Sequence, residues 1–239
     1  MSYFYYNIIG GHAVAVVSQR LLEEKQPQPK LQILIYPWTQ MVNMYTASNI
    51  YYKQKSAVPM PFAKIVSWYL GIKDIKQEII DAFVSHNYTL LFDNYDKYLS
   101  LMDVKKIPKK YKTGRSYYDN YENRVKHYMP NHKLDKTNIL VKDKKINSLF
   151  KKLSNKDFSP LLAEDKFIFG LPKAYFILLE WDAIKDEGIL YAERLREKGV
   201  EVKIAFYENA FHGIANLIDV FEIARQMQTD LIEYLKSGS

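Results

Sequence analysis

The chain has 239 residues, of which 48% are apolar and 26% charged, so it is long enough for one sizeable globular domain or two small ones. It contains no cysteine, which excludes a disulfide framework, a thiolate metal site and a thiol nucleophile. The net charge is +7, but residues 97–156 alone hold 17 Lys or Arg against 5 Asp or Glu. The remainder of the chain is therefore acidic.

The basic stretch 97–156 is interpreted as the solvated surface of an insertion. A cluster of Lys and Arg could instead dock on an anionic membrane or on nucleic acid, because counterion release favours such contacts. The runs 105–112 and 142–145 lack the glycine–aromatic signature of an RNA-recognition sheet, so no nucleic-acid partner is expected. No run approaches the roughly 18–20 uncharged apolar residues of a transmembrane helix, and the first residues lack the basic region of a signal peptide. We therefore expect a soluble chain.

The first 40 residues follow a strand–helix–strand pattern. The aromatic run "SYFYY" (2–6) favours a strand, and residues 10–25 pass from small residues into a helical pattern. The prolines of "QPQP" (26–29) end that helix. The apolar run "KLQILIYP" (30–37) is typical of a strand buried on both faces.

Residues 40–165 show no such alternation. The apolar clusters 65–71 and 78–84 predict short helices, separated by tyrosine-rich polar stretches. We interpret this region as an irregular, partly helical, lid-like insertion within a single domain that spans residues 1–239.

Alternation returns at residue 171. A buried strand (174–179) precedes an amphipathic helix (185–199), a further strand (201–207) and a long amphipathic helix (214–237). Alternating strands and helices predict an α/β fold with a mostly parallel sheet of about four strands, covered by helices.

Two ionisable residues directly follow neighbouring strands of this predicted sheet. Asp182 follows the strand 174–179, and His212 follows the strand 201–207. Ligands of open parallel sheets gather outside the carboxyl ends of the strands, so we expect these two side chains to meet there. A carboxylate that holds one imidazole nitrogen leaves the other nitrogen free to act as a general base.

Each of these residues also has a structural interpretation. Asp182 could cap the turn before the helix, although Asp186 is the better candidate for the N-cap. His212 could be an ordinary surface or interface histidine. Position alone does not decide between these alternatives.

Residues 158–214 resemble the C-terminal part of arylacetamide deacetylase-like enzymes, which belong to the hormone-sensitive lipase branch of α/β-hydrolases. The similar elements, in chain order, are "SPLLA", "LP" before a strand, "WDAIKDEG", "YAERLREKGV" and "FHG". The opening "IGG…VAVVSQRLL" and "LQILIYP" also resembles the helix and strand that follow the nucleophile elbow of that family.

The resemblance implies a partial α/β-hydrolase fold and an esterase or amidase of small acyl substrates, with Asp182 as the acid and His212 as the base of a Ser–Asp–His triad. The family elbow reads G-D-S-A-G-G. Placing Gly10 and Gly11 on its last two glycines puts Ile8 at the position of the nucleophilic serine and Tyr6 at that of the first glycine. Isoleucine cannot attack a carbonyl carbon.

The family's HGGG oxyanion loop is expected before the elbow and is not found in this sequence, which we interpret as N-terminally truncated. Removing one oxyanion donor costs on the order of 3–4 kcal/mol of transition-state stabilisation. The sequence therefore predicts either a carboxylic ester or amide hydrolase that is catalytically impaired, or a non-catalytic remnant or binding protein of the same fold.

The remaining expectations concern cofactors, partners and location. No cofactor or metal is expected, because the five histidines show no ligand spacing and no glycine-rich phosphate loop occurs. A bare sheet edge at residues 2–6 predicts self-association. Full-length members of the family are often anchored in the endoplasmic reticulum membrane, whereas the location of this chain is left open.

Overall fold

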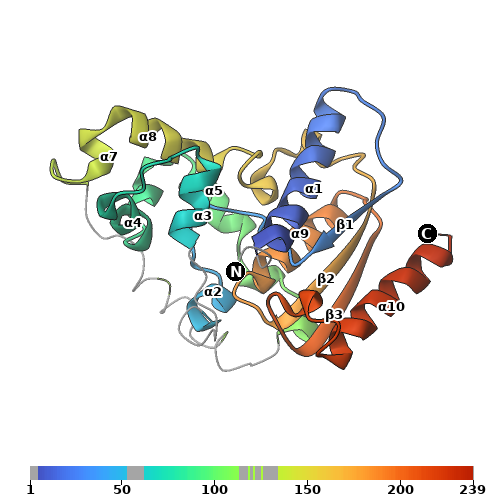
Figure 1. Ribbon diagram of the computed structural model, residues 1–239. Coiled ribbons are helices and arrows are strands. Elements are labelled where there is room, and N and C mark those ends of the chain that lie inside the picture. Colours follow the sequence, from blue (N-terminus) through green and yellow to red (C-terminus); the bar gives the residue numbers. More distant parts are fainter. Residues whose placement is uncertain are drawn as a thin grey trace.

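The computed structural model describes residues 5–52, 62–112, 118, 121, 125 and 134–238, with side chains from residue 10 onward. A parallel sheet organises the described chain (Figure 1). Its strands are β1 (Leu31–Ile35), β2 (Lys173–Trp181) and β3 (Val202–Phe211), in the order β1-β2-β3. The two pairings are parallel, as the alternation of strands and helices predicted.

Helices cover both faces of the sheet (Figure 1). Helices α1 (Tyr5–Glu23) and α9 (Lys185–Glu197) lie on one face, and α10 (Glu222–Lys236) lies on the other. Successive side chains of a strand point to opposite faces, so β2 contributes to two hydrophobic clusters. Phe176 and Leu178 join the cluster on the side of α1 and α9, whereas Tyr175 and Ile177 join the cluster under α10. Burial of each such side chain stabilises the fold by about 1.5–3 kcal/mol.

Two glycines allow helices to approach the sheet closely. A Cβ at Gly11 of α1 would lie 2.8 Å from the carbonyl oxygen of Ile35 and 3.1 Å from the Cα of Pro37. A Cβ at Gly188 of α9 would lie 2.6 Å from the side chain of Leu178. Backbone cannot yield as a flexible side-chain end can, so Gly11 sets the distance between α1 and the end of β1.

The region between β1 and β2 is helical and lies mostly to one side of the sheet (Figure 1). Its α-helices are α2 (Ala47–Tyr52), α3 (Phe62–Tyr69), α4 (Gln77–Val84), α5 (Tyr95–Leu101), α7 (Ile139–Lys142) and α8 (Lys144–Lys151). Short 3₁₀ turns occupy Asn87–Leu91, Val104–Lys106, Lys109–Tyr111, Lys152–Ser154, Pro160–Leu162 and Asp165–Phe167.

The hydrophobic core of this helical region is continuous with that of the sheet. Val66, Tyr88 and Phe150 from the helical region belong to the same buried cluster as Leu34 and Phe176 from the strands. The helices predicted at 65–71 and 78–84 correspond to α3 and α4. The assignment of 40–165 as a lid-like insertion in a single domain stays a prediction.

Three sequence-based expectations about the elements were wrong. Tyr5 and Tyr6 begin α1 instead of ending a strand, and the other residues of 2–6 lie outside the described part of the chain. The described sheet accordingly has three strands rather than about four. The predicted helix 214–237 is interrupted, because five non-helical residues separate a 3₁₀ turn at Ile214–Asn216 from α10.

The basic residues of 97–156 that the structure describes lie largely in water. Exposed lysines occur in the 3₁₀ turns of 104–111 and along α7 and α8, for instance Lys105, Lys109 and Lys145. This arrangement fits the interpretation of a solvated surface. Within the described residues no helix is both long and apolar enough to cross a bilayer.

Candidate functional site

Asp182 and His212 meet at the carboxyl ends of β2 and β3. Asp182 directly follows β2, and His212 directly follows β3. The Nδ1–H of His212 donates to Oδ2 of Asp182 over 2.7 Å, although 30 residues separate the two in sequence. The contact follows from parallel pairing of the two strands, which places both strand ends at the same edge of the sheet.

An irregularity in the sheet directs His212 toward Asp182. Leu179 pairs with Tyr207 and Trp181 pairs with Phe211, so β3 holds three residues between these pairs where β2 holds one. Asn209 accommodates the extra length with a left-handed φ of 58°, and its N–H donates to Oε2 of Glu180 over 2.8 Å. Bulges near strand ends commonly re-aim a side chain, and this one lies just before His212.

The second imidazole nitrogen of His212 is available. Nε2 is buried and has no hydrogen-bond partner among the described residues. The ring packs against Tyr36, with centroids 4.6 Å apart and planes at 59°. Tyr36 directly follows β1 and has an unusual φ of 32°, and its N–H donates to the carbonyl of Ile177. Strained backbone of this kind is frequent at functional sites, where the surrounding structure holds it in place.

The carboxylate of Asp182 serves two partners at once. Its Oδ1 accepts the N–H of Ile184 over 2.9 Å, and its Oδ2 accepts the imidazole of His212. The side chain is 1% exposed, so water cannot replace either bond. The turn-capping and histidine-orienting interpretations of Asp182 therefore both describe its contacts. An orienting carboxylate of this kind fixes the imidazole tautomer and stabilises the imidazolium.

Asp186 does not cap α9, contrary to the sequence-based expectation. The N-cap residue is Ile184, whose side chain makes no cap hydrogen bond. Asp186 lies inside the first turn of α9 and is fully buried. Its carboxylate accepts the N–H of Ser48 over 2.8 Å and the hydroxyl of Tyr118 over 2.6 Å. The orientation of the Asp186 carboxylate is therefore set by these two donors, which come from distant segments of the chain.

The first turn of α9 buries two further ionisable side chains. Lys185 is 0% exposed, and burial lowers its pKa, although the nearby carboxylates of Asp186, Glu180 and Asp182 raise it. Its Nζ lies 3.5 Å from the carbonyl oxygen of Tyr111. Glu187 is also 0% exposed, and burial raises the pKa of its carboxyl group well above the ordinary value.

A buried polar segment, residues 39–49, lies against this turn. Gln40 donates to Oε1 of Glu187 over 2.8 Å, and Thr39 donates to the carbonyl of Glu187 over 2.9 Å. Ser48 donates to the carbonyl of Ala183 over 2.9 Å. Sequence reasoning missed this segment. The only signal was a run of polar residues among apolar ones after a buried strand, in "TQMVNMYTASN".

Ile8, the residue placed at the nucleophile position, lies in the helical backbone of α1. It precedes Gly11 by about one helical turn, and Gly11 abuts the end of β1. Tyr36 follows β1 there and packs on His212. The first turns of α1 therefore start at the edge of the sheet that carries Asp182 and His212.

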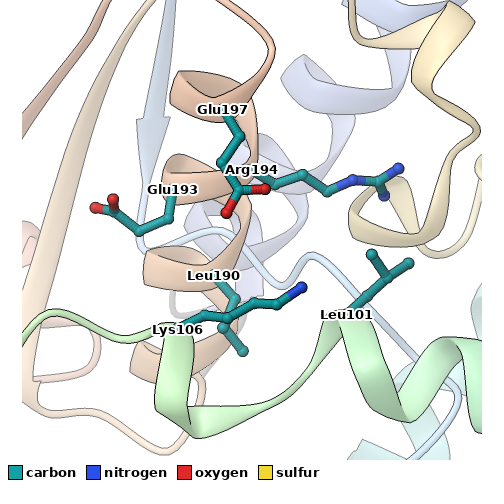
Figure 2. Close-up of a pocket in the computed structure, with 6 residues that line it drawn as sticks. All are labelled: Leu101, Lys106, Leu190, Glu193, Arg194 and Glu197. Carbon is teal, nitrogen blue, oxygen red and sulfur yellow. The ribbon is translucent and has the colours of Figure 1, made fainter.

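A hollow drawn in Figure 2 lies elsewhere on α9. Its walls come from α9 and from the segment of residues 101–106, and they are formed by Leu101, Lys106, Leu190, Glu193, Arg194 and Glu197. These α9 residues lie about 7–18 Å along the helix from Lys185. The guanidinium of Arg194 points away toward the carbonyls of Leu161 and Ala163, which it binds. The hollow is therefore separate from the Asp182–His212 pair.

No group of three His, Asp or Glu in the described part of the chain is arranged to hold a metal ion. The chemistry that the described arrangement can perform is proton transfer at Nε2 of His212, with Asp182 stabilising the imidazolium.

A family model described as the α/β-hydrolase fold matches residues 114–216, a range that includes both Asp182 and His212. Arylacetamide deacetylase-like 4 family member 1 of Mus musculus is 30% identical, over 95% of this chain and 52% of the relative. Neutral cholesterol ester hydrolase 1 of Rattus norvegicus is 28% identical, over 85% of this chain and 46% of the relative. The chain thus spans about half the length of the curated relatives it matches.

Solved structures share the fold at lower identity. A hyperthermophilic esterase from the archaeon Pyrobaculum calidifontis matches 97% of this chain and 50% of its own, with a TM-score of 0.55 and 19% identity. A thermophilic carboxylesterase cloned from a metagenomic library matches 97% of this chain and 53% of its own, with a TM-score of 0.56 and 19% identity.

Proposed function

Because this chain belongs to the α/β-hydrolase family, we propose that it carries the acid–base half of a carboxylic ester or amide hydrolase site. Asp182 orients His212, and Nε2 of His212 is the general base. The observation that carries this proposal is the 2.7 Å bond between Nδ1 of His212 and Oδ2 of Asp182, combined with a buried, unpartnered Nε2 among the described residues. The substrate class is a small acyl ester or amide.

The chain on its own is catalytically impaired under this proposal. A hydrolase of this type forms an acyl-enzyme through a nucleophile that the base activates. The residue at the corresponding position is Ile8, whose side chain has no nucleophilic atom. An Asp–His pair could activate water directly, but without a nucleophile that forms the acyl-enzyme the expected turnover is negligible.

The experiment compares five forms of the 239-residue chain: wild type, Ile8→Ser, His212→Ala, the double variant of these two, and Ile9→Ser. Wild type is expected to hydrolyse a nitrophenyl acetate no faster than His212→Ala, and to resist labelling by a fluorophosphonate. Ile8→Ser is expected to gain fluorophosphonate labelling that disappears when His212→Ala is added. Ile9→Ser is the matched control, because the next helical position faces about 100° away.

Two results contradict the proposal. Fast hydrolysis by wild type that His212→Ala abolishes would end the claim of impairment while retaining the hydrolase assignment. Equal labelling of Ile8→Ser and Ile9→Ser, independent of His212, would end the assignment of position 8 and of the base.

The alternative is a non-catalytic binding protein of the same fold. It predicts saturable binding of an ester by the wild-type chain without turnover, measurable as a ligand-dependent rise in the melting temperature. Binding that survives Ile8→Ser and His212→Ala unchanged would favour this alternative over an impaired hydrolase.

The proposal also includes self-association along the sheet edge. Among the described residues β1 pairs only with β2, so its other edge carries backbone groups that a further strand could bind. Sedimentation velocity over a range of concentrations tests this, and a monomer at every concentration would refute it.

A further inference from the structure

We infer that Ser48 and Asp186 are positioning residues that hold the turn carrying Asp182, so that its carboxylate stays aimed at His212. The inference rests on the proposed roles of Asp182 and His212. It adds to this pair two supporting residues that lie in α2 and α9 and not at the ends of β2 and β3. It starts from contacts that link α2, α9 and the turn between β2 and α9.

The turn between β2 and α9 is held from outside through the carbonyl of Ala183. This carbonyl accepts the hydroxyl of Ser48 over 2.9 Å and also the side-chain amide of Asn49. The carbonyl of Ala183 and the N–H of Ile184 belong to the same peptide unit, so holding this carbonyl also holds the N–H that donates to Oδ1 of Asp182 over 2.9 Å.

Ser48 and Asp186 bind each other reciprocally. The N–H of Ser48 donates to Oδ2 of Asp186 over 2.8 Å, and the N–H of Asp186 donates to Oγ of Ser48 over 3.2 Å. Each residue is the second of its helix, Ser48 in α2 and Asp186 in α9. The first N–H groups of a helix have no partner within that helix, so each side chain satisfies one for the other helix.

Burial makes the two reciprocal hydrogen bonds between Ser48 and Asp186 rigid. Ser48 and Asp186 are both 0% exposed, so water does not compete for their bonds. The second oxygen of Asp186 accepts the hydroxyl of Tyr118 over 2.6 Å. A buried carboxylate with both oxygens engaged has one favourable orientation, because any rotation leaves donors unsatisfied. Ser48 is thereby fixed, and its hydroxyl fixes the Ala183 carbonyl.

The test measures the His212–Asp182 bond directly, without relying on activity. The Nδ1 proton of an imidazole bonded to a carboxylate gives a low-field proton NMR resonance, identified here by its loss in His212→Ala. In Ser48→Ala the exchange of this proton with water is expected to accelerate by about five- to tenfold, as loss of one buried hydrogen bond implies. Ser48→Thr keeps the hydroxyl and is expected to restore the wild-type exchange rate.

Ser67→Ala is the matched control. Ser67 is 2% exposed and donates to the carbonyl of Ala63 within α3, so its loss removes a buried serine hydrogen bond far from the turn. It is expected to lower global stability while leaving the His212 resonance unchanged. A purely structural role for Ser48 predicts the same behaviour as Ser67→Ala.

The outcomes separate this inference from the proposed function. Absence of the low-field resonance in wild type would refute the Asp182–His212 pair itself. Its presence in wild type, with unchanged exchange in folded Ser48→Ala, would overturn the positioning role alone. Should Ser48→Ala not fold, Asp186→Asn replaces it, because an amide offers one acceptor oxygen to two donors. Unchanged exchange in that variant overturns the inference equally.

Discussion

Replacement of Glu187 by glutamine is expected to change the pH dependence of stability. Glu187 is 0% exposed in the first turn of α9, and burial raises the pKa of its carboxyl group well above the ordinary 4.5. The amide of Gln40, 2.8 Å from Oε1, opposes the shift without cancelling it. The folded protein therefore holds this carboxyl group neutral at pH values where the unfolded chain ionises it.

The sign and size follow from proton linkage. Below pH 4.5 the carboxyl group is neutral in both states, and its stabilising contribution is complete. As the pH rises above that value, the unfolded state loses its proton first, and the free energy of unfolding falls by about 1.4 kcal/mol per pH unit. The fall continues until the pH reaches the raised pKa of the folded state.

Glutamine has nearly the same size and never ionises, so Glu187→Gln abolishes this loss. Urea unfolding at several pH values between 4 and 7 measures the difference between variant and wild type, in which the other titrating groups cancel. Relative to wild type, the variant is expected to gain about 1.4 kcal/mol for each pH unit above 4.5, up to the raised pKa of Glu187. Glu197→Gln, at an exposed position of the same helix, is the control and is expected to show no such gain. Parallel stability curves for Glu187→Gln and wild type would refute the reasoning.

Two further predictions concern close packing and the buried contact between Asp182 and His212. Gly11→Ala is expected to destabilise the fold by about 1–3 kcal/mol, because its Cβ would lie 2.8 Å from the carbonyl oxygen of Ile35. The control, Gly10→Ala, places its Cβ more than 4 Å from any other group and is expected to stabilise α1 by about 0.5–1 kcal/mol. Equal effects in thermal unfolding would contradict this geometry. In a double-mutant cycle, Asp182→Asn and His212→Ala are expected to couple by about 1–3 kcal/mol, since their contact is a charge-assisted bond with a carboxylate 1% exposed. Additive losses would mean that the two side chains do not interact.

The juxtaposition of Asp182 and His212 could be predicted because it depends on a topological rule. The apolar run 174–179 and the strand candidate 201–207 were recognisable in the sequence, and one helix joins them. Consecutive strands joined by a helix pair in parallel as neighbours, so residues after their ends meet at one edge of the sheet. The rule needs only the order of elements. The distance of 2.7 Å additionally depends on the extra residues of β3, which the sequence pattern did not indicate.

The role of Asp186 could not be predicted in the same way. Its place at the start of a helix suggested an N-cap, which is a local interaction. Its observed partners are Ser48 and Tyr118, which lie 138 and 68 residues away. A carboxylate bonds whichever donors the fold brings to it, and local propensity contains no information about donors that arrive from distant segments.

The sequence by itself determined the alternation of strands and helices, the parallel sheet and the two ionisable residues at its edge, because these follow from hydrophobic periodicity and chain order. Only the tertiary structure decided that residues 5 and 6 are helical, that residues 217–221 interrupt the last helix, and that a buried polar network joins α2 to α9. This network depends on contacts between segments that are distant in the sequence. There the free energy of satisfying buried polar groups outweighs the local preferences that a sequence displays.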